Sequence, residues 1–473
     1  MKKSEKILFV AACIVICLIP FVGMTVAPTN DTTENRKMVQ LPAFIEGDTI
    51  NKEYLEQLGL YFEDHFALRN MLVMADSVIQ SKVFYVSNMD TVIAGKDGWL
   101  YYTATLSDYQ GKQTLSERGV WNAVHNLSMT QHYVENHGAT FLVTVAPNKN
   151  SLYSENMPYY YKNKVSNTKN MDLFDKALLE SQISYVNLFE LFEKQEETLY
   201  LKRDSHWNQK GAVLVYNAMM DFLMLEHDTY ETVPNIRTKT EYGDLNKMLY
   251  PFCVFPEWNY AYQKEQDYSY MTDTQGVEDT WIETVNKEGK GSLLMFRDSF
   301  GNTLLPLMAD TFKTAYFSKT VPYNLEQYME NYEPENVIIE KVERNIDDFA
   351  QEPPIITAFE VDVPGEIQTV TTKTTLEMKE SEYNVDYWQI AGSMDEEYMS
   401  EDSPVYVKLT NGDYQKIYEA FTVSLEDSDW GYLLYLAKDE VLPGKMEVSV
   451  LTGTDKSLLQ VQMGTFDTSL LDK

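Results

Sequence analysis

Short apolar segments alternate with amphipathic helical patterns between residues 116 and 342, and this alternation constrains the fold more than any other feature. The helical patterns cover residues 116–138, 170–181, 208–225 and 302–312, and five apolar segments lie between or after them, at residues 140–147, 183–190, 291–296, 314–318 and 336–342. Strands that alternate with helices form a parallel sheet, and helices cover both of its faces. The sequence therefore predicts an α/β domain over residues 41–354.

Two other regions do not follow this pattern. Residues 231–290 form a tyrosine-rich, acidic insertion that could line one wall of a cleft. Residues 355–473 lose helical periodicity and read as short β segments separated by NGD, PGK and GTD turns. This spacing predicts a C-terminal β-sandwich, which could bind carbohydrate. Its aromatic groups, Tyr387-Trp388 and Trp430-Gly431-Tyr432, would serve either as sugar-stacking residues or as sandwich core.

The N-terminus carries a basic segment followed by 21 uncharged residues, ILFVAACIVICLIPFVGMTVA. This run is long enough to span the ~30 Å apolar layer of a membrane. Lys2, Lys3 and Lys6 precede it, which orients the remainder of the chain to the extracytoplasmic side. We predict a single-pass anchor at residues 1–27 and a polar linker at 28–40; a cleaved signal peptide is the alternative interpretation.

Charge and cysteine content narrow the classes of partner. The formal net charge is −33, from 72 acidic and 39 basic residues, so nucleic acid is not an expected partner. An anionic polymer is also disfavoured as a substrate, unless a local basic groove outweighs the overall negative charge. Cys13 and Cys17 lie in the apolar run, which leaves Cys253 alone in the body. We therefore expect no disulfide or thiolate metal site there, and interpret Cys253 as a structural thiol.

The segment RDSHWNQ places Asp204 two residues before His206. In an extended segment such residues point to the same side, so the carboxylate can accept the Nδ1 proton and leave Nε2 as a base. Asn208 would cap the helix that follows. A loop histidine held by a local hydrogen bond is the structural alternative.

A serine on a sharp turn would complete this pair, and the segment GSLLMF-RDSFGN supplies Ser299 between a strand and a helix. The free N–H groups of a helix start can stabilise an oxyanion there. Gly301 would give the turn backbone freedom and limit crowding near the serine. Alternatively, Ser299 is only a helix cap. The two segments together favour a Ser299–His206–Asp204 triad.

These motifs resemble the DHHW and AlgX/AlgJ-type family of SGNH-like polysaccharide O-acetyltransferases. The resemblance rests on D-S-H-W and F-R-D-S-F-G-N, and on further pieces in the same order: EDHFALRN, GKDGWLYY, VAPNKNSLYSENMP, GDL and ENVIIEKVERN. It covers roughly residues 41 to 350. The D-x-H segment precedes the serine here, as in the circularly permuted block order of the AlgX-like branch. The first histidine of the family's D-H-H-W is replaced by Ser205 here, and a G-x-N-D block is missing.

The resemblance implies that Ser299 is the nucleophile, His206 the base and Asp204 its orienter, with an acetyl group passed from Ser299 to an exported polysaccharide. It also implies an acyl-transporting (MBOAT-like) membrane protein as donor, and places Trp207 beside the triad. Asn302, Arg344 and Asn345 are candidate oxyanion donors, and Arg297 is either structural or substrate-binding. Asn148 and Lys149 follow a strand end, where they line either the cleft or a solvated turn. We expect no metal and no cofactor.

Two other functions fit the same sequence. An esterase would use the same triad with water as acceptor, and its chemistry up to the acyl-enzyme would be identical. A non-catalytic, membrane-tethered glycan-binding scaffold would keep the triad only as a relic.

Overall fold

The computed structural model describes residues 3–26, 29, 38–46, 49–112, 114–250, 255–271, 273–274, 276–363, 366–370, 375–454 and 457–468. Cys253 and most of the predicted linker at 28–40 lie outside these residues.

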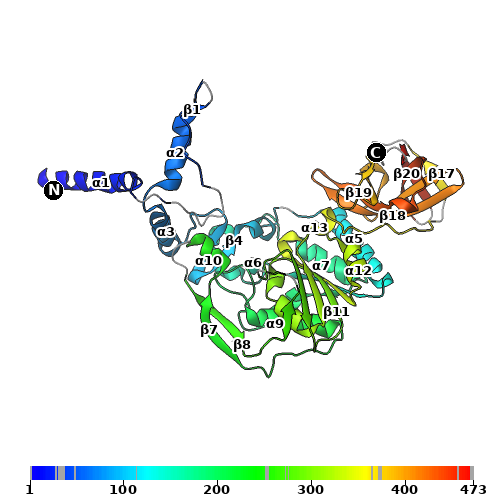
Figure 1. Ribbon diagram of the computed structural model, residues 1–473, viewed down its shortest axis with the longest axis horizontal. Helices are drawn as coiled ribbons and strands as arrows, with labels where there is room; N and C mark the ends of the chain where they lie inside the picture. The colour runs from blue at the N-terminus through cyan, green and yellow to red at the C-terminus, as the bar shows by residue number, and fades with distance from the viewer. Residues whose placement is uncertain are drawn as a thin grey trace.

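The N-terminal apolar run forms one helix, α1 (Lys3–Gly23), which projects from the rest of the protein (Figure 1). Its segment Lys6–Gly23 has a mean hydropathy of 2.6, and none of that segment is buried. This length and composition suit a membrane span, although a signal sequence has the same properties. The chain continues through a short β1–β2 hairpin (Ile45–Glu46 and Thr49–Ile50) and the helices α2 (Tyr54–His65) and α3 (Arg69–Ile79).

A seven-stranded sheet organises the central domain, with strand order β6-β5-β13-β11-β12-β10-β9 among the described residues. The strands from β6 to β12 in this order pair in parallel, as the alternating pattern predicted. Their bounds are β5 Thr140–Ala146, β6 Tyr185–Val186, β11 Ser292–Phe296, β12 Thr314–Ser318 and β13 Asn336–Val342.

Helices cover both faces of this sheet because alternate residues of each buried strand point to opposite sides. One face packs against α8 (Leu188–Glu193), α9 (Gln209–Phe222) and α11 (Leu305–Thr311). The other face packs against α5 (Glu117–Asn136), α7 (Asn170–Glu180), α12 (Leu325–Tyr332) and α13 (Asp348–Gln351). The predicted α/β architecture, with helices on both faces of one sheet, is therefore confirmed.

The insertion at 231–290 was predicted to line a cleft, and part of it also extends the sheet. Strands β9 (Tyr268–Tyr270) and β10 (Trp281–Asn286) add to its edge, and they run antiparallel to their neighbours. The sheet is therefore mixed and not wholly parallel, which corrects the prediction. The first half of the insertion forms the hairpin β7 (Asn235–Glu241) and β8 (Glu257–Tyr262) and the helix α10 (Asp244–Leu249).

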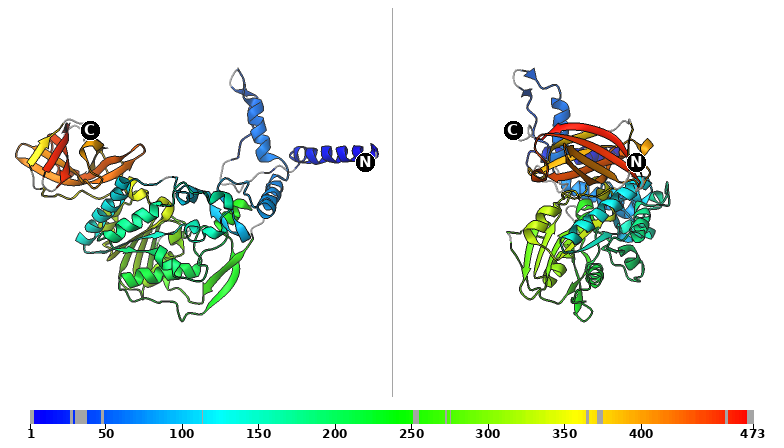
Figure 2. Two further views of the ribbon diagram at one scale, coloured as in Figure 1. Left: turned by 180° about the vertical axis from the view of Figure 1, so that it is seen from behind. Right: turned by 90° about the vertical axis from the view of Figure 1, so that its right-hand side faces the viewer.

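The C-terminal region is a separate β structure, as Figures 1 and 2 show. Its eight strands form one continuous order, β14-β21-β20-β17-β18-β19-β16-β15. The bounds are β14 Glu366–Thr369, β15 Thr375–Glu380, β16 Tyr387–Ser393, β17 Val405–Asn411, β18 Tyr414–Leu425, β19 Ser428–Ala437, β20 Lys445–Thr454 and β21 Ser457–Asp467. Strand β18 pairs with β17 along its first half and with β19 along its second, so it joins two sheet halves that enclose a common core. Trp388 and Tyr432 belong to that core, so they are not exposed sugar-stacking residues.

The two β halves are fixed to the central domain through α5. The Asn126 side chain donates hydrogen bonds to the carbonyls of Phe349 and Thr422, both at 2.9 Å. Phe421 and Val423 of β18 join the apolar core on that face of the central sheet. The C-terminal region therefore covers the α5 side of the central domain.

Candidate active site

The predicted acid and histidine lie on a tight loop between Leu199 and Asn208. Tyr200 and Trp207 form an isolated antiparallel bridge at its base, and the Asn208 N–H donates to the Leu199 carbonyl at 2.7 Å. Asn208 also caps α9, since its side chain accepts the Gly211 N–H at 3.0 Å, as predicted. The bridge and the cap together place residues 201–206 at the tip of the loop.

Lys149 fills the inside of this loop. Its ammonium donates to the carbonyls of Leu201 and Lys202, both at 3.1 Å, and to that of Asp204. Its side chain is buried, and burial lowers the pKa of Lys149 to about 8, although the charges of nearby acids oppose this. Lys149 therefore positions the loop and is not a residue of a solvated turn.

Asp204 and His206 lie side by side at the tip. His206 Nδ1 donates to Asp204 Oδ1 at 2.6 Å, and the His206 backbone N–H donates to the same oxygen at 2.9 Å. Burial alone would raise the pKa of Asp204, but these bonds lower it to about 2. Burial alone would lower the pKa of His206, but the Asp204 carboxylate raises it. Asp204 is therefore favoured as a charged carboxylate that orients the imidazole through Nδ1, and Nε2 is left to accept a proton.

Ser299 lies three residues after the end of β11 and immediately before the 3₁₀ turn η6 (Phe300–Asn302). Asp298 holds this turn, because its two oxygens accept the N–H groups of Phe300 at 2.8 Å and Val342 at 2.7 Å. The second bond links the turn to the end of β13. The strand-to-helix turn expected from D-S-x-G is therefore tied to the edge of the sheet.

The two segments meet between His206 and Ser299. The Ser299 hydroxyl lies 2.9 Å from His206 Nε2, and 93 residues separate the two in sequence. The ring of Phe300 packs edge-on against the imidazole, with centroids 4.6 Å apart. Ser299, His206 and Asp204 thus form a continuous hydrogen-bonded chain.

Asp244 is a second acid beside His206 that the sequence reasoning did not assign. Its Oδ1 accepts the Ser205 N–H at 2.8 Å, its Oδ2 accepts the Ser205 hydroxyl, and Oδ2 lies 3.9 Å from His206 Nδ1. Its own N–H donates to Asp204 Oδ2 at 2.9 Å. The family-like piece GDL was the available signal, although spacing alone could not indicate that it folds back on the D-x-H loop.

Asp244 can come this close to Asp204 because the residue before it, Gly243, has no side chain. A Cβ at Gly243 would lie 2.2 Å from the Arg203 carbonyl oxygen and 2.8 Å from the Asp204 nitrogen. The backbone at Gly243 therefore packs directly on the Arg203–Asp204 peptide, where no side chain fits. This contact aligns the Asp244 N–H with the Asp204 carboxylate.

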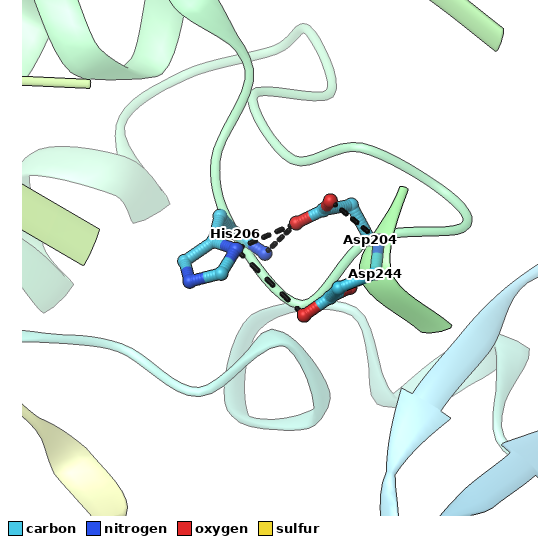
Figure 3. A group of neighbouring side chains, drawn as sticks. All are labelled: Asp204, His206 and Asp244. Carbon is cyan, nitrogen blue, oxygen red and sulfur yellow. Dashed lines mark hydrogen bonds and ion pairs between the residues drawn. The ribbon is translucent and has the colours of Figure 1, made fainter. Parts of the chain in front are cut away.

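Asp204, His206 and Asp244 also bring their ligand-type atoms within 4.8 Å of one another (Figure 3). Each carboxylate oxygen, however, already accepts a hydrogen bond from a protein N–H or O–H group. Nε2 points away from both carboxylates in Figure 3. This donor set fits two acids that orient an imidazole better than it fits a metal ion.

Asn148 and Arg344 line a small cleft beside Ser205, together with Tyr101, Tyr102, Thr105, Lys149 and Asn150. The Asn148 amide is buried, and neither its nitrogen nor its oxygen has a hydrogen-bond partner among the described residues. Arg344 stacks against the rings of Tyr102 and Phe300 at 5.5 and 5.9 Å. These two side chains remain candidates for contacting an acyl oxygen or a substrate. Asn345 is adjacent in sequence but is not among the residues that line the cleft.

The other predicted site residues have structural contacts. Trp207 is fully buried and donates to the Thr303 hydroxyl at 2.6 Å, so it packs behind the triad and does not face substrate. Arg297 is buried, donates to the Val277 carbonyl at 2.8 Å, and donates to Asn302 Oδ1 at 2.5 Å. The Asn302 amide nitrogen donates to Glu278 Oε1 at 2.8 Å, so it is already engaged, which disfavours it as an oxyanion donor.

The structure requires a glycine at position 301 for a different reason from the predicted one. A Cβ there would lie 2.7 Å from the Arg297 Cβ, and its φ angle is outside the left-handed region. Gly301 is therefore required by close packing against Arg297, and not by backbone freedom at the nucleophile.

A serine, histidine and aspartate joined at the carboxyl edge of a helix-covered sheet are typical of SGNH-type enzymes. Residues 92–288 match the family model described as the SGNH hydrolase-like domain of acetyltransferase AlgX. This match confirms the resemblance over residues 92–288. The matched segment includes Asp204 and His206 and ends before Ser299.

Solved structures with a similar fold include Bacillus cereus PatB1, at 16% identity and a TM-score of 0.44 over 55% of this chain and 98% of that chain. A DHHW family protein from Eubacterium siraeum has 16% identity and a TM-score of 0.39 over 54% and 95% of the two chains. The O-acetyltransferase domain of Pseudomonas putida AlgJ has 16% identity and a TM-score of 0.37 over 54% and 92%. No curated protein matches the chain.

Proposed function

We propose that this protein is a membrane-anchored, extracytoplasmic O-acetyltransferase that modifies an exported or cell-surface polysaccharide. The observation that carries the proposal is the hydrogen-bonded chain from Ser299 Oγ through His206 to Asp204. The AlgX-type domain match supports polysaccharide O-acetylation in general. The placement of the D-x-H segment before the serine agrees with the permuted block order of that branch.

In the first step, Ser299 Oγ attacks the carbonyl carbon of a donor acetyl ester while His206 Nε2 takes the hydroxyl proton. Asp204 stabilises the imidazolium that forms. The new negative charge on the carbonyl oxygen requires hydrogen-bond donors, and the unpaired Asn148 amide and Arg344 line the cleft beside Ser205, the residue before His206. When the tetrahedral intermediate collapses, His206 returns the proton to the leaving oxygen, and the acetyl group stays on Ser299.

In the second step, a sugar hydroxyl gives its proton to His206 Nε2 and attacks the acetyl-serine carbonyl. Collapse of this intermediate breaks the bond to Ser299 Oγ, which recovers the proton from His206. The products are an acetylated sugar and free enzyme. Water in place of the sugar would make the same residues an esterase.

The helix α1 supports anchoring, since it is apolar, long enough to span, and separate from the packed domains. An anchored enzyme would remain close to polymer emerging from the cell and to an MBOAT-like donor protein in the same membrane. We propose residues 41–354 as the catalytic unit and residues 355–473 as an accessory unit that could contact glycan.

The test supplies an activated acetyl ester with and without a neutral oligosaccharide and compares the parent with Ser299→Ala. Ser269→Ala is the matched control, because Ser269 is exposed on the edge strand β9. The parent should yield acetylated sugar and an acetyl adduct on Ser299 by mass spectrometry. Ser299→Ala should lose at least roughly a thousandfold in rate, as removal of a triad nucleophile does.

The other outcomes of this test would favour one of the two alternative functions. Acetate release without transfer to sugar would favour the esterase. Equal rates for the parent and Ser299→Ala would exclude the triad mechanism and leave the glycan-binding scaffold.

A further inference from the structure

A cleft of about 340 Å³ lies between the β7–β8 hairpin and the loop that carries the triad acid and base. Lys202 and Arg203, the two residues immediately before Asp204, line one side. Arg237 and Lys239 of β7 and Trp258 of β8 line the other. None of these side chains has a role in the triad chemistry.

The charge of this cleft contrasts with the rest of the protein. Four of its lining residues are cationic, in a chain whose formal net charge is −33. Within the part of the chain that the structure describes, none of the four lies within 4 Å of a carboxylate oxygen, unlike Lys210, Lys264 and Lys319 of the same domain. Unpaired cations gathered in one hollow create a positive local potential that attracts anions.

The one acid that lines the cleft has a structural use. Glu257 is buried, and its carboxylate accepts the backbone N–H groups of Lys202 at 2.7 Å and Arg203 at 3.0 Å. Burial raises the pKa of Glu257 above its usual value, and the two backbone hydrogen bonds oppose this. The same two bonds attach the hairpin to the catalytic loop, so the cleft and the triad are held in a fixed relation.

The hairpin side also presents an aromatic surface. Trp258 is 49% exposed, and the Arg237 guanidinium stacks on its ring at 5.0 Å, with the Lys239 ammonium at 6.0 Å. A guanidinium that stacks through its face keeps its edge N–H groups available for a carboxylate or a phosphate. An exposed tryptophan offers a flat apolar face of the kind on which a sugar ring can stack.

We propose that this cleft binds an anionic glycan chain, whose sugars or linkages carry carboxylate or phosphate groups, beside the catalytic loop. Cations recognise the charged groups and Trp258 contacts a sugar ring. If the chain is an acetyltransferase as proposed above, this names the acceptor as an acidic polysaccharide; the binding itself does not depend on that activity.

A membrane surface is less suited to this site. The cationic groups line a hollow, and Trp258 and Arg237 stack on each other along one face of the hairpin. The hairpin also extends away from α1, the segment that would lie in the membrane (Figures 1 and 2).

The experiment measures binding of the full-length chain in detergent to three polymers of matched length by calorimetry. A polyuronate tests carboxylates, a poly(glycerol phosphate) tests phosphates, and dextran is the neutral control. At least one anionic polymer should bind about tenfold or more tightly than dextran, and its affinity should fall as salt rises from 50 to 500 mM, an expected screening range of roughly 14 to 4 Å. The polymer that binds more tightly identifies the source of the charge.

Two variants test the site itself. Arg237→Gln/Lys239→Gln removes two exposed charges and should weaken anionic binding about fivefold or more. Lys176→Gln/Lys194→Gln removes two exposed charges from α7 and the end of α8 and should leave the affinity unchanged. Trp258→Ala should also weaken binding, while Ser299→Ala should bind like the parent, which separates this proposal from the catalytic one. Thermal unfolding verifies that each variant folds.

Three results would overturn the proposal. One is dextran binding as tightly as the anionic polymers. Another is unchanged anionic affinity in Arg237→Gln/Lys239→Gln. The third is that no polymer binds while phosphatidylglycerol vesicles bind in a way that depends on Arg237 and Lys239, which would assign the cleft to a lipid surface.

Discussion

Asp244→Asn should shift the pH dependence of catalysis without removing the triad. The Asp244 carboxylate lies 3.9 Å from His206 Nδ1, and its charge is one of the causes that raise the pKa of His206. Coulomb's law gives about 1 kcal/mol for two unit charges at this separation in water and about 4 kcal/mol at an effective dielectric constant of 20. Because the Asp244 side chain is 32% exposed, solvent screening favours the lower end.

His206 acts as a base only when it is neutral, so activity should fall at low pH as the imidazole gains a proton. Without the Asp244 charge the protonated imidazole is less stable, and the acid limb of kcat/KM should move to lower pH by roughly one pH unit. The asparagine keeps the shape of the side chain and can still accept the Ser205 N–H. The rate on the high-pH plateau should therefore change much less than the position of the limb.

The assay is the pH profile of kcat/KM for hydrolysis of an activated acetyl ester between pH 4 and 9. Glu193→Gln removes an exposed charge on α8 and should leave the profile in place. If the acid limb of Asp244→Asn coincides with that of the parent, the charge of Asp244 does not reach the catalytic imidazole. A uniform drop in rate at every pH would instead assign Asp244 a purely structural role.

Two further substitutions test the supports of the site. Gly243→Ala should lower the free energy of unfolding by about 2 kcal/mol and reduce kcat for the acetyl ester, because the new Cβ meets the Arg203 carbonyl, a backbone group that cannot rotate away; an unchanged melting temperature and kcat would contradict this packing. Burial, followed by the charge of Asp108, raises the pKa of Glu343 to about 8. The native state therefore holds the Glu343 proton more tightly than the unfolded chain does. The stability that results is complete below about pH 4.5 and is lost as the pH rises through about 8. Glu343→Gln should remove that loss, so urea unfolding at pH 5 and pH 8 should show a smaller decrease for the variant than for the parent; equal decreases would refute the assignment.

The sequence predicted the elements whose patterns are local. The apolar run that became β11, the turn at Ser299 and the cap at Asn208 each depend on a few consecutive residues, and each occurs where the pattern indicated. The prediction over residues 183–190 was less accurate. Only Tyr185–Val186 is a strand, because the Asn187 side chain accepts the Glu190 N–H and begins α8.

The parts that sequence reasoning missed depend on contacts between distant segments. Nothing in the insertion at 231–290 marks β10 as a neighbour of β12, since edge pairing is decided by which strand reaches the open side of the sheet. Asp244 lies 40 residues after Asp204, and only the close approach at Gly243 brings them together. The unassigned role of Asp244 and the mixed edge of the sheet therefore have the same physical origin.

The loop that carries Asp204 and His206 shows this dependence most clearly. The loop has little regular structure of its own beyond the bridge between Tyr200 and Trp207. Its backbone is instead fixed by the buried ammonium of Lys149 on its carbonyls and by the buried carboxylate of Glu257 on its N–H groups. Each of these buried charges would be costly without the loop, and the loop would leave several buried polar groups unpaired without them. The imidazole is therefore held by groups contributed before and after it in the chain, so the D-x-H motif indicates the chemistry while the surrounding fold determines where that chemistry occurs.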